Sequence, residues 1–430
     1  MKIVVYGLWH LGSVTAACLA EAGFTTVGLD PDAGVAARLA ASQPPLHEPG
    51  LPELVKNGAA AGRLSFSADL AVVADADIVW VAFDTPVDDE DRADAAYVAA
   101  RVEGLFPHLK SGAVVLISSQ LPVGSTAALA ARYANFARDG GVQFAYSPEN
   151  LRLGKAIDVF RHPERIVVGT QDGRPNDPLA GVLSRFSDNL IWMSVESAEM
   201  VKHALNAFLA TSVTFINEIA TICEQVGARA SDVEEGLRSE ARIGRKAYLK
   251  PGGAFAGGTL ARDVRFLGQL ADSHGLETPL LSGILPSNAA HRQWPLRRVI
   301  DCLGDLKGRR VAVLGLAYKP GTDALRRSAA VELCHDLVAK GAHVQAFDPV
   351  VRDLPSDLAV KIELRHTIGD ALANAEAAVI ATEWPEFRAI TGSLCVERMS
   401  SPVVIDQNGF LATVLEAADA IDYLTLGRGR

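Results

Sequence analysis

Short apolar runs alternate with amphipathic stretches in the first part of the chain. The apolar runs are Lys2–Tyr6, Thr25–Leu29, Ile78–Ala82 and Val114–Ser118. Helical periodicity separates them, for example over Val14–Glu21 and Asp94–Leu105. Brief strands that are apolar on both faces and that alternate with helices are typical of a parallel, doubly wound sheet. The pattern predicts an α/β domain over residues 1–195.

The same alternation returns late in the chain. Its expected elements are the strand Arg310–Gly315, the helix Ala329–Lys340 and the strands Val344–Phe347, Ala377–Ala381 and Val403–Asp406. This pattern predicts a second α/β domain over residues 296–430. The two halves repeat an architecture and not a sequence.

A long helical pattern, Ser197–Val226, lies between the two regions. Ser197 is its expected N-cap, and Glu196 and Glu199 suit the positive end of the helix dipole. Gly227 suits its C-terminus. We therefore expect a central helical domain over residues 196–295.

The first expected strand and helix are joined by a glycine-containing turn, GLWHLG, at the position of a G-x-G-x-x-G dinucleotide motif. Asp30 ends the second strand, where an acid binds the adenosine ribose and disfavours a 2′-phosphate, so NAD is expected and not NADP. Trp9 replaces the glycine that lets a pyrophosphate approach the backbone. Its indole either points away or blocks the cofactor. The cofactor contacts expected here are Gly7, Trp9, His10, Leu11, Gly12 and Asp30, in a Rossmann-like domain.

Composition narrows the class of partner. The chain has 430 residues, 49% of them hydrophobic, and a net charge of −10, which disfavours nucleic acid and anionic membranes as partners. No signal-peptide pattern and no apolar run long enough to span a bilayer is expected. The five cysteines are scattered and odd in number, as for reduced core residues of a cytoplasmic protein. No cluster has metal-ligand spacing, so no metal is expected.

Several further motifs follow one another in the order and spacing of a known family. They are Glu48–Leu51 (EPGL), Thr85-Pro86, Tyr146–Arg152 (YSPENLR), Lys202–Thr211 (KHALNAFLAT), Tyr248–Gly252, Leu314–Asp323 with Arg326, and Thr382–Trp384. With this set the chain resembles the UDP-glucose/GDP-mannose dehydrogenases over nearly its whole length. The resemblance implies two Rossmann-like domains joined by a long helix that also forms a dimer interface. It further implies NAD as cofactor and a UDP- or GDP-linked sugar as substrate.

The resemblance also implies roles for single residues. Lys202 and Asn206 share a helix face, where a cation and an amide can stabilise a developing alkoxide. Glu149 is expected to bind or activate water, and Asp263 to support base chemistry. Thr85 and Gln120 are expected at the cofactor cleft. The implied substrate contacts are Leu151, Arg152, Tyr248, Gly252, Phe255, Gly257, Lys319 and Arg326, the last from the same or a partner subunit.

One departure from the family pattern changes the expected chemistry. The segment Phe255–Asp263 reads FAGGTLARD, with Thr259 where the family has its catalytic cysteine. That cysteine adds to the aldehyde formed by the first oxidation, and the thiohemiacetal is then oxidised to an acid. A threonine hydroxyl is a far poorer nucleophile. Gln120 also replaces a threonine that positions the catalytic water.

Three functions follow from these residues. The chain oxidises an alcohol of a nucleotide-linked sugar with NAD, either stopping at the carbonyl or reaching the acid through a hydrate without covalent catalysis. Alternatively, it performs the full family reaction to a uronic acid by another route. As a third possibility it is a non-catalytic nucleotide or nucleotide-sugar binder, for which Trp9 is the main argument. We adopt the first as the working hypothesis, for a cytoplasmic homodimer in polysaccharide precursor synthesis.

Overall fold

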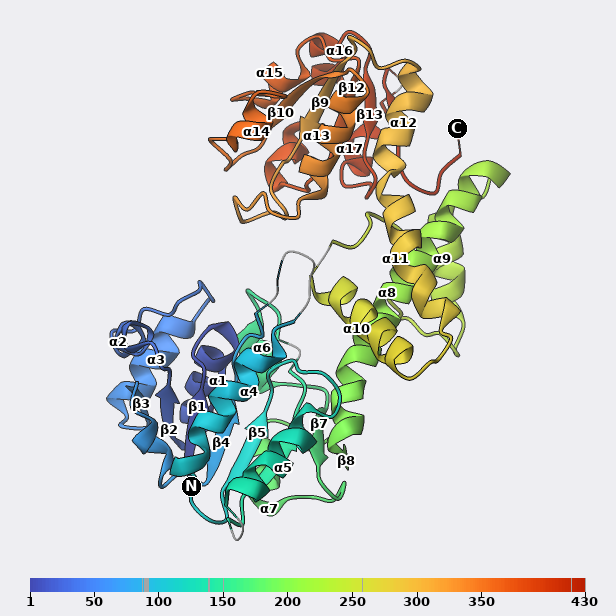
Figure 1. Ribbon diagram of the computed structural model, residues 1–430. Coiled ribbons are helices and arrows are strands. Elements are labelled where there is room, and N and C mark those ends of the chain that lie inside the picture. The colour runs from blue at the N-terminus through green and yellow to red at the C-terminus, as the bar shows by residue number, and fades with distance from the viewer. Residues whose placement is uncertain are drawn as a thin grey trace. The chain divides into compact units, whose positions relative to one another are not determined.

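A computed structural model describes residues 1–86, 88, 93–137, 140–149, 151–256, 258–418 and 420–429. The chain forms two compact units, Met1–Leu205 and Asn206–Arg430. Each unit contains one α/β sheet with helices packed on it (Figure 1). The expected fold, with two Rossmann-like sheets and a long central helix, is confirmed.

The first sheet has the strand order β3-β2-β1-β4-β5-β6-β7-β8. Its strands are β1 Lys2–Tyr6, β2 Thr25–Leu29, β3 Leu64–Ser67, β4 Ile78–Val81, β5 Val114–Ile117, β6 Gln143–Tyr146, β7 Ile166–Thr170 and β8 Leu190–Ser194. The order reverses between β1 and β4, which is where ligands bind in open α/β sheets.

One strand pair departs from the expected all-parallel sheet. Strands β6 and β7 are antiparallel and pair through Tyr146 and Gly169. The reason is the connection, residues 147–165, which leaves the carboxyl end of β6 and enters β7 at the same edge of the sheet. This connection carries Glu149, Leu151 and Arg152, so the reversal keeps all three at the carboxyl edge.

Helices cover both faces of the first sheet. They are α1 His10–Glu21, α2 Ala33–Ala40, α3 Leu51–Ala60, α4 Ala95–Leu105, α5 Ser125–Phe136, α6 Ala156–Arg161 and α7 Asp177–Leu183, with 3₁₀ turns η1 Leu70–Val73 and η2 Phe106–His108. Alternate residues of β1 point to opposite faces: Ile3 and Val5 pack with α1 and α3, and Val4 and Tyr6 pack with α4 and α5. Both layers are buried, which explains the continuous apolar runs.

The long helix α8 spans Val195–Val226 and begins two residues before the expected start. Ser197 is therefore inside the helix and is not its N-cap, because the Oγ of Ser194 accepts a hydrogen bond from the Ser197 amide at 3.2 Å. Gly227 follows the helix with φ +74°, as expected for its C-terminus. By length and composition α8 also meets the criterion for a membrane span, which the sequence reading did not anticipate. Its polar residues Lys202 and Asn217 are buried and hydrogen-bonded, as in a core helix.

The second unit begins within α8 and continues with a helical region. Its helices are α9 Ala230–Ser239, α10 Thr259–Ser273, α11 Pro279–Arg292 and α12 Trp294–Leu303. Ala207 and Ala210 of α8 pack with Val264 of α10 and Ile284 of α11 in a small apolar core. This core fixes α10, the helix that starts at Thr259.

The second sheet has the order β11-β10-β9-β12-β13-β14, with all its neighbours parallel. Its strands are β9 Arg310–Leu314, β10 His343–Phe347, β11 Glu363–Leu364, β12 Ala377–Ile380, β13 Val403–Ile405 and β14 Asp422–Leu424. Its helices are α13 Ala329–Ala339, α14 Ser356–Ala359, α15 Ile368–Leu372, α16 Gly392–Arg398 and α17 Ala412–Leu415, with the 3₁₀ turn η3 Pro385–Ala389.

The architectural repeat extends to the turn after the first strand of each sheet. Gly7 and Gly315 have φ of +95° and +91°, and each donates its amide to the end of the neighbouring strand. A following amide binds an acid at that strand end: Leu8 donates to Asp30 at 2.8 Å, and Leu316 donates to Asp348 at 2.7 Å. Asp348 also accepts from the Ala317 amide and the Trp384 indole. Asp348 therefore accepts more hydrogen bonds from the protein than Asp30 does.

Candidate active site

The glycine turn of the first sheet meets the steric requirement of a dinucleotide site. A Cβ on Gly12 would lie 1.7 Å from the carbonyl oxygen of Gly7, and a Cβ on Gly7 would lie 2.8 Å from the ring of Phe83. Both positions therefore require glycine. The turn brings the N-terminus of α1, the usual pyrophosphate site, against the ends of β1 and β4.

Trp9 does not distort this turn. It has φ −75°, which any residue adopts, and its side chain is 43% exposed. The missing glycine is thus not needed for the backbone conformation, and the indole is not packed across the turn. Leu11, by contrast, is buried on α1. The residues fit a dinucleotide.

The remaining cofactor residues also lie at the carboxyl edge of the first sheet. The two carboxylate oxygens of Asp30 accept from the amides of Leu8 and Asp32 at 2.8 and 2.9 Å. Thr85, after β4, donates its hydroxyl to the Gln120 carbonyl after β5 at 2.6 Å. The structure therefore brings the predicted cofactor residues of strands β1, β2, β4 and β5 to one edge.

His10 has a partner that the sequence reading did not assign. Its Nε2 donates to Glu48 at 2.9 Å, and Glu48 also accepts from the amides of Gly154 and Ala156 at 2.8 and 2.9 Å. Burial acts to raise the pKa of Glu48, but these hydrogen bonds outweigh it and hold the pKa below the ordinary glutamate value. Glu48 thereby joins the start of α1 to the loop that contains Arg152.

Glu149 and Lys202 are brought together in the first unit. The Lys202 ammonium is buried and donates to the Glu149 carbonyl at 2.6 Å, while the Glu149 carboxylate accepts from the Leu151 amide at 2.7 Å. Both residues line a cavity of about 110 Å³ whose other walls are largely apolar. Thr15 lines it too, and its buried hydroxyl has no partner among the described residues.

Asn206 and Asp263 are paired in the second unit. The Asn206 amide donates to the Asp263 carboxylate, and both side chains are buried. Thr259 is the first residue of α10, one turn before Asp263, and is exposed. The predicted catalytic set is thus divided: Glu149 and Lys202 belong to the first unit, and Asn206, Thr259 and Asp263 to the second.

The segment before Thr259 is held by side chains that the sequence reading missed. We call residues 252–258 the active-site loop; Gly257, a predicted substrate contact, lies outside the described residues. The Gly252 amide donates to Asn217 at 3.0 Å, and the Gly252 carbonyl accepts from His291 at 2.8 Å. Burial lowers the pKa of His291, which favours the neutral donor. The Gly253 amide donates to Asn408 at 2.6 Å.

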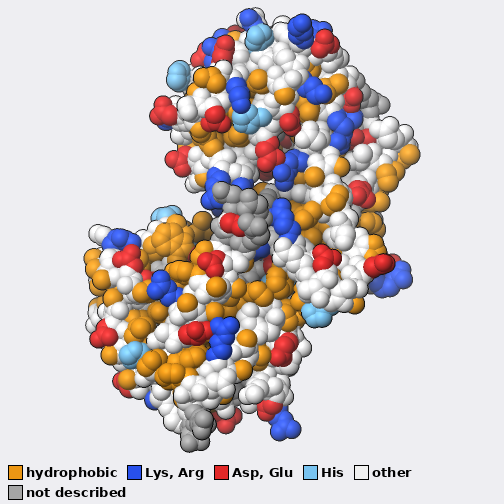
Figure 2. All heavy atoms as spheres, in the orientation of Figure 1, with side chains coloured by type: hydrophobic (Ala, Val, Ile, Leu, Met, Phe, Trp, Pro, Cys, Tyr) orange, Lys and Arg blue, Asp and Glu red, His pale blue; other side chains and the backbone are white. Residues whose placement is uncertain are grey.

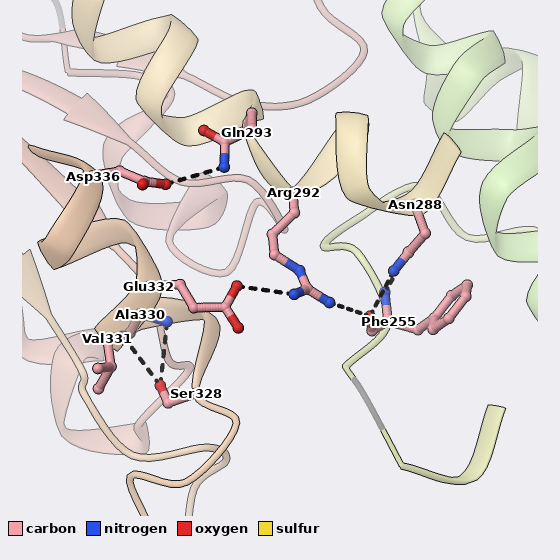
Figure 3. Close-up of polar contacts among 9 residues, drawn as sticks. All are labelled: Phe255, Asn288, Arg292, Gln293, Ser328, Ala330, Val331, Glu332 and Asp336. Atoms are coloured by element: carbon pink, nitrogen blue, oxygen red, sulfur yellow. Dashed lines mark hydrogen bonds and ion pairs between the residues drawn. The ribbon is translucent and has the colours of Figure 1, made fainter. Parts of the chain in front are cut away.

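Phe255 is fixed at both of its backbone polar groups (Figure 3). Its amide donates to the Asn288 side chain at 3.0 Å, and its carbonyl accepts from the same side chain at 2.8 Å. Asn288 and His291 are buried polar residues three apart on α11. That spacing puts them on one helix face and is the signal that identifies them in the sequence.

The other predicted substrate residues are on the surface. Tyr248 is 58% exposed, and Arg152, Lys319 and Arg326 are also exposed. Lys319 and Arg326 lie between β9 and α13, at the carboxyl edge of the second sheet. The neighbouring Arg327, which the sequence reading passed over, directs its Nη1 to within 3.6 Å of the position that a Cβ on Gly258 would take.

The cysteine thiols are poorly suited to replace a missing nucleophile. Four of the five are buried, and Cys302 is partly buried. Burial raises the pKa of Cys18 and Cys334 to about 12 and that of Cys395 to about 11. The thiolate is the reactive form, so these three thiols are unreactive near neutral pH.

Comparison with known proteins agrees with this geometry. Models of three domains of one family match consecutive parts of the chain: the NAD binding domain at residues 1–186, the central domain at 196–290 and the UDP binding domain at 312–413. The chain belongs to the UDP-glucose/GDP-mannose dehydrogenase family. Residues 1–186 are therefore the NAD-binding domain of a nucleotide-sugar dehydrogenase.

Individual members of the family are similar over their full lengths. The chain is 34% identical to UDP-glucose 6-dehydrogenase TuaD of Bacillus subtilis, covering 99% of this chain and 93% of that protein. It is 35% identical to UDP-glucose 6-dehydrogenase of Rhizobium meliloti, covering 100% of both. The solved UDP-glucose dehydrogenase of Pyrobaculum islandicum matches with a TM-score of 0.81 and 30% identity, covering 98% of each chain.

Proposed function

We propose that this family member oxidises an alcohol of a UDP-linked sugar with NAD and releases the carbonyl product without a covalent enzyme intermediate. The UDP-binding domain and the UDP-glucose 6-dehydrogenases among its relatives support a UDP-linked substrate. Thr259 supports the non-covalent course, because its hydroxyl is a poor nucleophile.

The observation that carries the proposal is the buried Asn206–Asp263 pair one turn from Thr259. A buried carboxylate and its partner often stabilise a fold no more than apolar side chains of the same size would, so we infer that this pair has a further role. A charge held beside the reacting position is such a role. A protein that only bound nucleotide would not need it.

The chain's residues take the following proposed roles. The ammonium of Lys202 and the amide of Asn206, one turn apart on α8, stabilise the alkoxide as the alcohol passes its proton to the water held by the Glu149 carboxylate. Asp263 orients Asn206, and Glu149 orients Lys202 through its carbonyl and binds water through its carboxylate. Thr259 contacts the substrate but forms no covalent bond with it.

NAD fits the turn built by Gly7, Gly12 and Asp30, and when bound it accepts the hydride. In our proposal the carboxylate of Asp30 holds the adenosine ribose, and the start of α1 with His10 and Leu11 faces the pyrophosphate. Trp9 lies at the rim of this site. Thr85 and Gln120, which link the ends of β4 and β5, would contact the bound cofactor. The exposed side chain and ordinary φ of Trp9 support a turn that keeps its shape without the second glycine.

We propose the following substrate contacts. Lys319 and Arg326 bind the diphosphate, and Gly252, Phe255 and Gly257 are proposed to contact the sugar. The remaining contacts are Leu151, Arg152 and Tyr248. We propose a division into domains at 1–195, 196–295 and 296–430.

We further propose a cytoplasmic homodimer that forms along α8. Phe208, Phe215, Ile222 and Val226 recur at steps of seven and four and are 69%, 47%, 56% and 69% exposed. This stripe is apolar enough to pack against its copy. On the visible face, Lys and Arg side chains are interspersed with Asp and Glu (Figure 2), which argues against nucleic acid as a partner.

The test is NADH formation by the purified protein with UDP- and GDP-linked sugars. We expect NADH with at least one UDP-sugar and none after Lys202→Ala. Lys155→Ala, at an exposed lysine in the same unit, is the control. No NADH with any of these sugars, together with no NAD binding, would support the non-catalytic alternative.

A further inference from the structure

Arg292, at the end of α11, connects two segments that are distant in sequence (Figure 3). Its Nη1 donates to Glu332 at 2.9 Å, and its Nη2 donates to the Phe255 carbonyl at 3.4 Å. Phe255 belongs to the active-site loop, and Glu332 lies in the first turn of α13. One guanidinium therefore touches both the loop before Thr259 and the helix of the second sheet.

The start of α13 also closes the loop that carries Lys319 and Arg326. The Ser328 hydroxyl accepts from the amides of Ala330 and Val331 and donates to the Leu316 carbonyl at 2.6 Å. Residues 316–328 thus form a loop whose two ends are fixed to each other and to α13. We call this segment the diphosphate loop.

Further contacts tie α13 and the diphosphate loop to the same region. Gln293, next to Arg292, donates to Asp336 of α13 at 3.0 Å. Arg327 has φ +62°, a left-handed conformation that is unfavourable for arginine, and its guanidinium points to Gly258. Strained residues of this kind persist where surrounding contacts hold them and are concentrated at functional sites.

The Arg292–Glu332 pair contributes little to stability, because its side chains are 29% and 47% exposed. Asn288, which is buried, already fixes Phe255 to α11. What Arg292 adds is a connection from Phe255 to α13. We therefore attribute the contacts of Arg292 to this connection and not to a gain in stability.

We propose that Arg292 is a positioning residue that couples nucleotide binding to the active-site loop. A nucleoside diphosphate held by Lys319 and Arg326 fixes the diphosphate loop and α13. Glu332 then holds Arg292, which holds the Phe255 carbonyl of the active-site loop. The guanidinium of Arg327 lies beside Gly258. The inference rests on the proposed function in that the diphosphate loop must bind the nucleotide.

The experiment uses the full chain with UDP as the probe. Hydrogen exchange is measured with and without UDP on peptides covering the active-site loop and the diphosphate loop, and UDP affinity by calorimetry. Arg292→Met removes both contacts, and Arg292→Lys retains the charge. Arg309→Met is the matched control, since Arg309 forms an ion pair with Glu376 in the same unit, away from the active-site loop.

In the native protein we expect UDP to slow exchange in both loops. In Arg292→Met, UDP should bind within about fivefold of the native affinity and protect only the diphosphate loop. Its kcat should fall by about tenfold to a hundredfold with little change in KM, as for a misplaced reacting group. Arg292→Lys should recover part of this loss, and Arg309→Met should behave like the native protein.

Two results would overturn the coupling while leaving the proposed function intact. One is a UDP effect on the active-site loop of Arg292→Met that equals the native effect. The other is a loop that exchanges fast in Arg292→Met without UDP and regains full protection with it, since this would indicate a structural contact alone. Failure of UDP to bind the native chain would instead contradict the proposed function and the coupling with it.

Discussion

The Asn206 amide donates to the Asp263 carboxylate in the core of the second unit, and the two side chains are only 6% and 0% exposed. This bond joins α8 to α10 one turn beyond Thr259. A buried carboxylate keeps its charge only when donors surround it. The pair therefore links α8 to α10 in the fold and, in our proposal, lies near the substrate.

Replacing Asn206 with Ala should lower the free energy of unfolding by about 2 kcal/mol, because Asp263 loses a charge-assisted hydrogen bond in the core. Urea denaturation at constant m-value measures this loss. The control is Asp272→Asn, at an exposed position of α10, the helix that carries Asp263; it should change stability by less than about 0.5 kcal/mol. Native stability in Asn206→Ala would show that the pair is not a significant contact.

Replacing Thr259 with Cys should allow the second oxidation. The residue begins α10, where the helix dipole lowers a thiol pKa and makes the thiolate available. We expect a carboxylate product by mass spectrometry from Thr259→Cys. Thr259→Ser keeps a hydroxyl and should release the same product as the native protein. If Thr259→Cys forms no acid, a different departure from the family sequence pattern must prevent the second oxidation.

Substitutions at Gly12 and Trp9 of the glycine turn should affect NAD binding to very different extents. A methyl group on Gly12 would collide with the Gly7 carbonyl, which cannot move without opening the turn. Gly12→Ala should therefore weaken NAD binding by about a hundredfold or more. Trp9 has an ordinary backbone conformation, so Trp9→Gly should change NAD affinity by no more than about fivefold. A titration with NAD distinguishes the two, and a large gain in affinity from Trp9→Gly would show that the indole obstructs the site.

Glu48 should make stability depend on pH in the acid range. Its pKa in the fold lies below the ordinary value of 4.5, so the fold favours the ionised form. This stabilisation is complete above the unfolded-state pKa and is lost as the pH falls through the lower folded-state pKa. The Tm difference between the native protein and Glu48→Gln should thus be largest near pH 6 and shrink below about pH 4. A Tm difference that stays constant from pH 6 to below about pH 4 would show that the fold does not lower the pKa of Glu48.

The sequence was sufficient for the parts of the fold that depend on local pattern. The apolar runs Lys2–Tyr6 and Thr25–Leu29 are strands with the predicted bounds, because strands buried on both faces are apolar throughout. The antiparallel β7 was missed, since strand direction is decided by the path of the connection. The start of α8 was misplaced because Ser194 and Ser197 are both good caps, and only the tertiary contacts choose between them.

In the candidate site, too, the sequence does not predict features that depend on tertiary contacts. The motifs predict candidate catalytic residues, and those roles stay predictions; the residues that hold the candidates in place were missed. Glu48 lies in a motif, but its bonds reach Gly154 and Ala156, over a hundred residues away. Arg292 has no motif, and only the position of α13 gives it a function. Such supporting contacts are long-range, so local sequence carries little signal for them.

The central claim is hydride transfer from a UDP-linked sugar without a covalent intermediate. Its most direct test is the product of the native protein with NAD and the best UDP-sugar, weighed by mass spectrometry while NADH is counted. The account predicts one NADH per sugar and a product lighter by two hydrogens, or its hydrate. A carboxylate with two NADH per sugar, or no NADH at all, would contradict it.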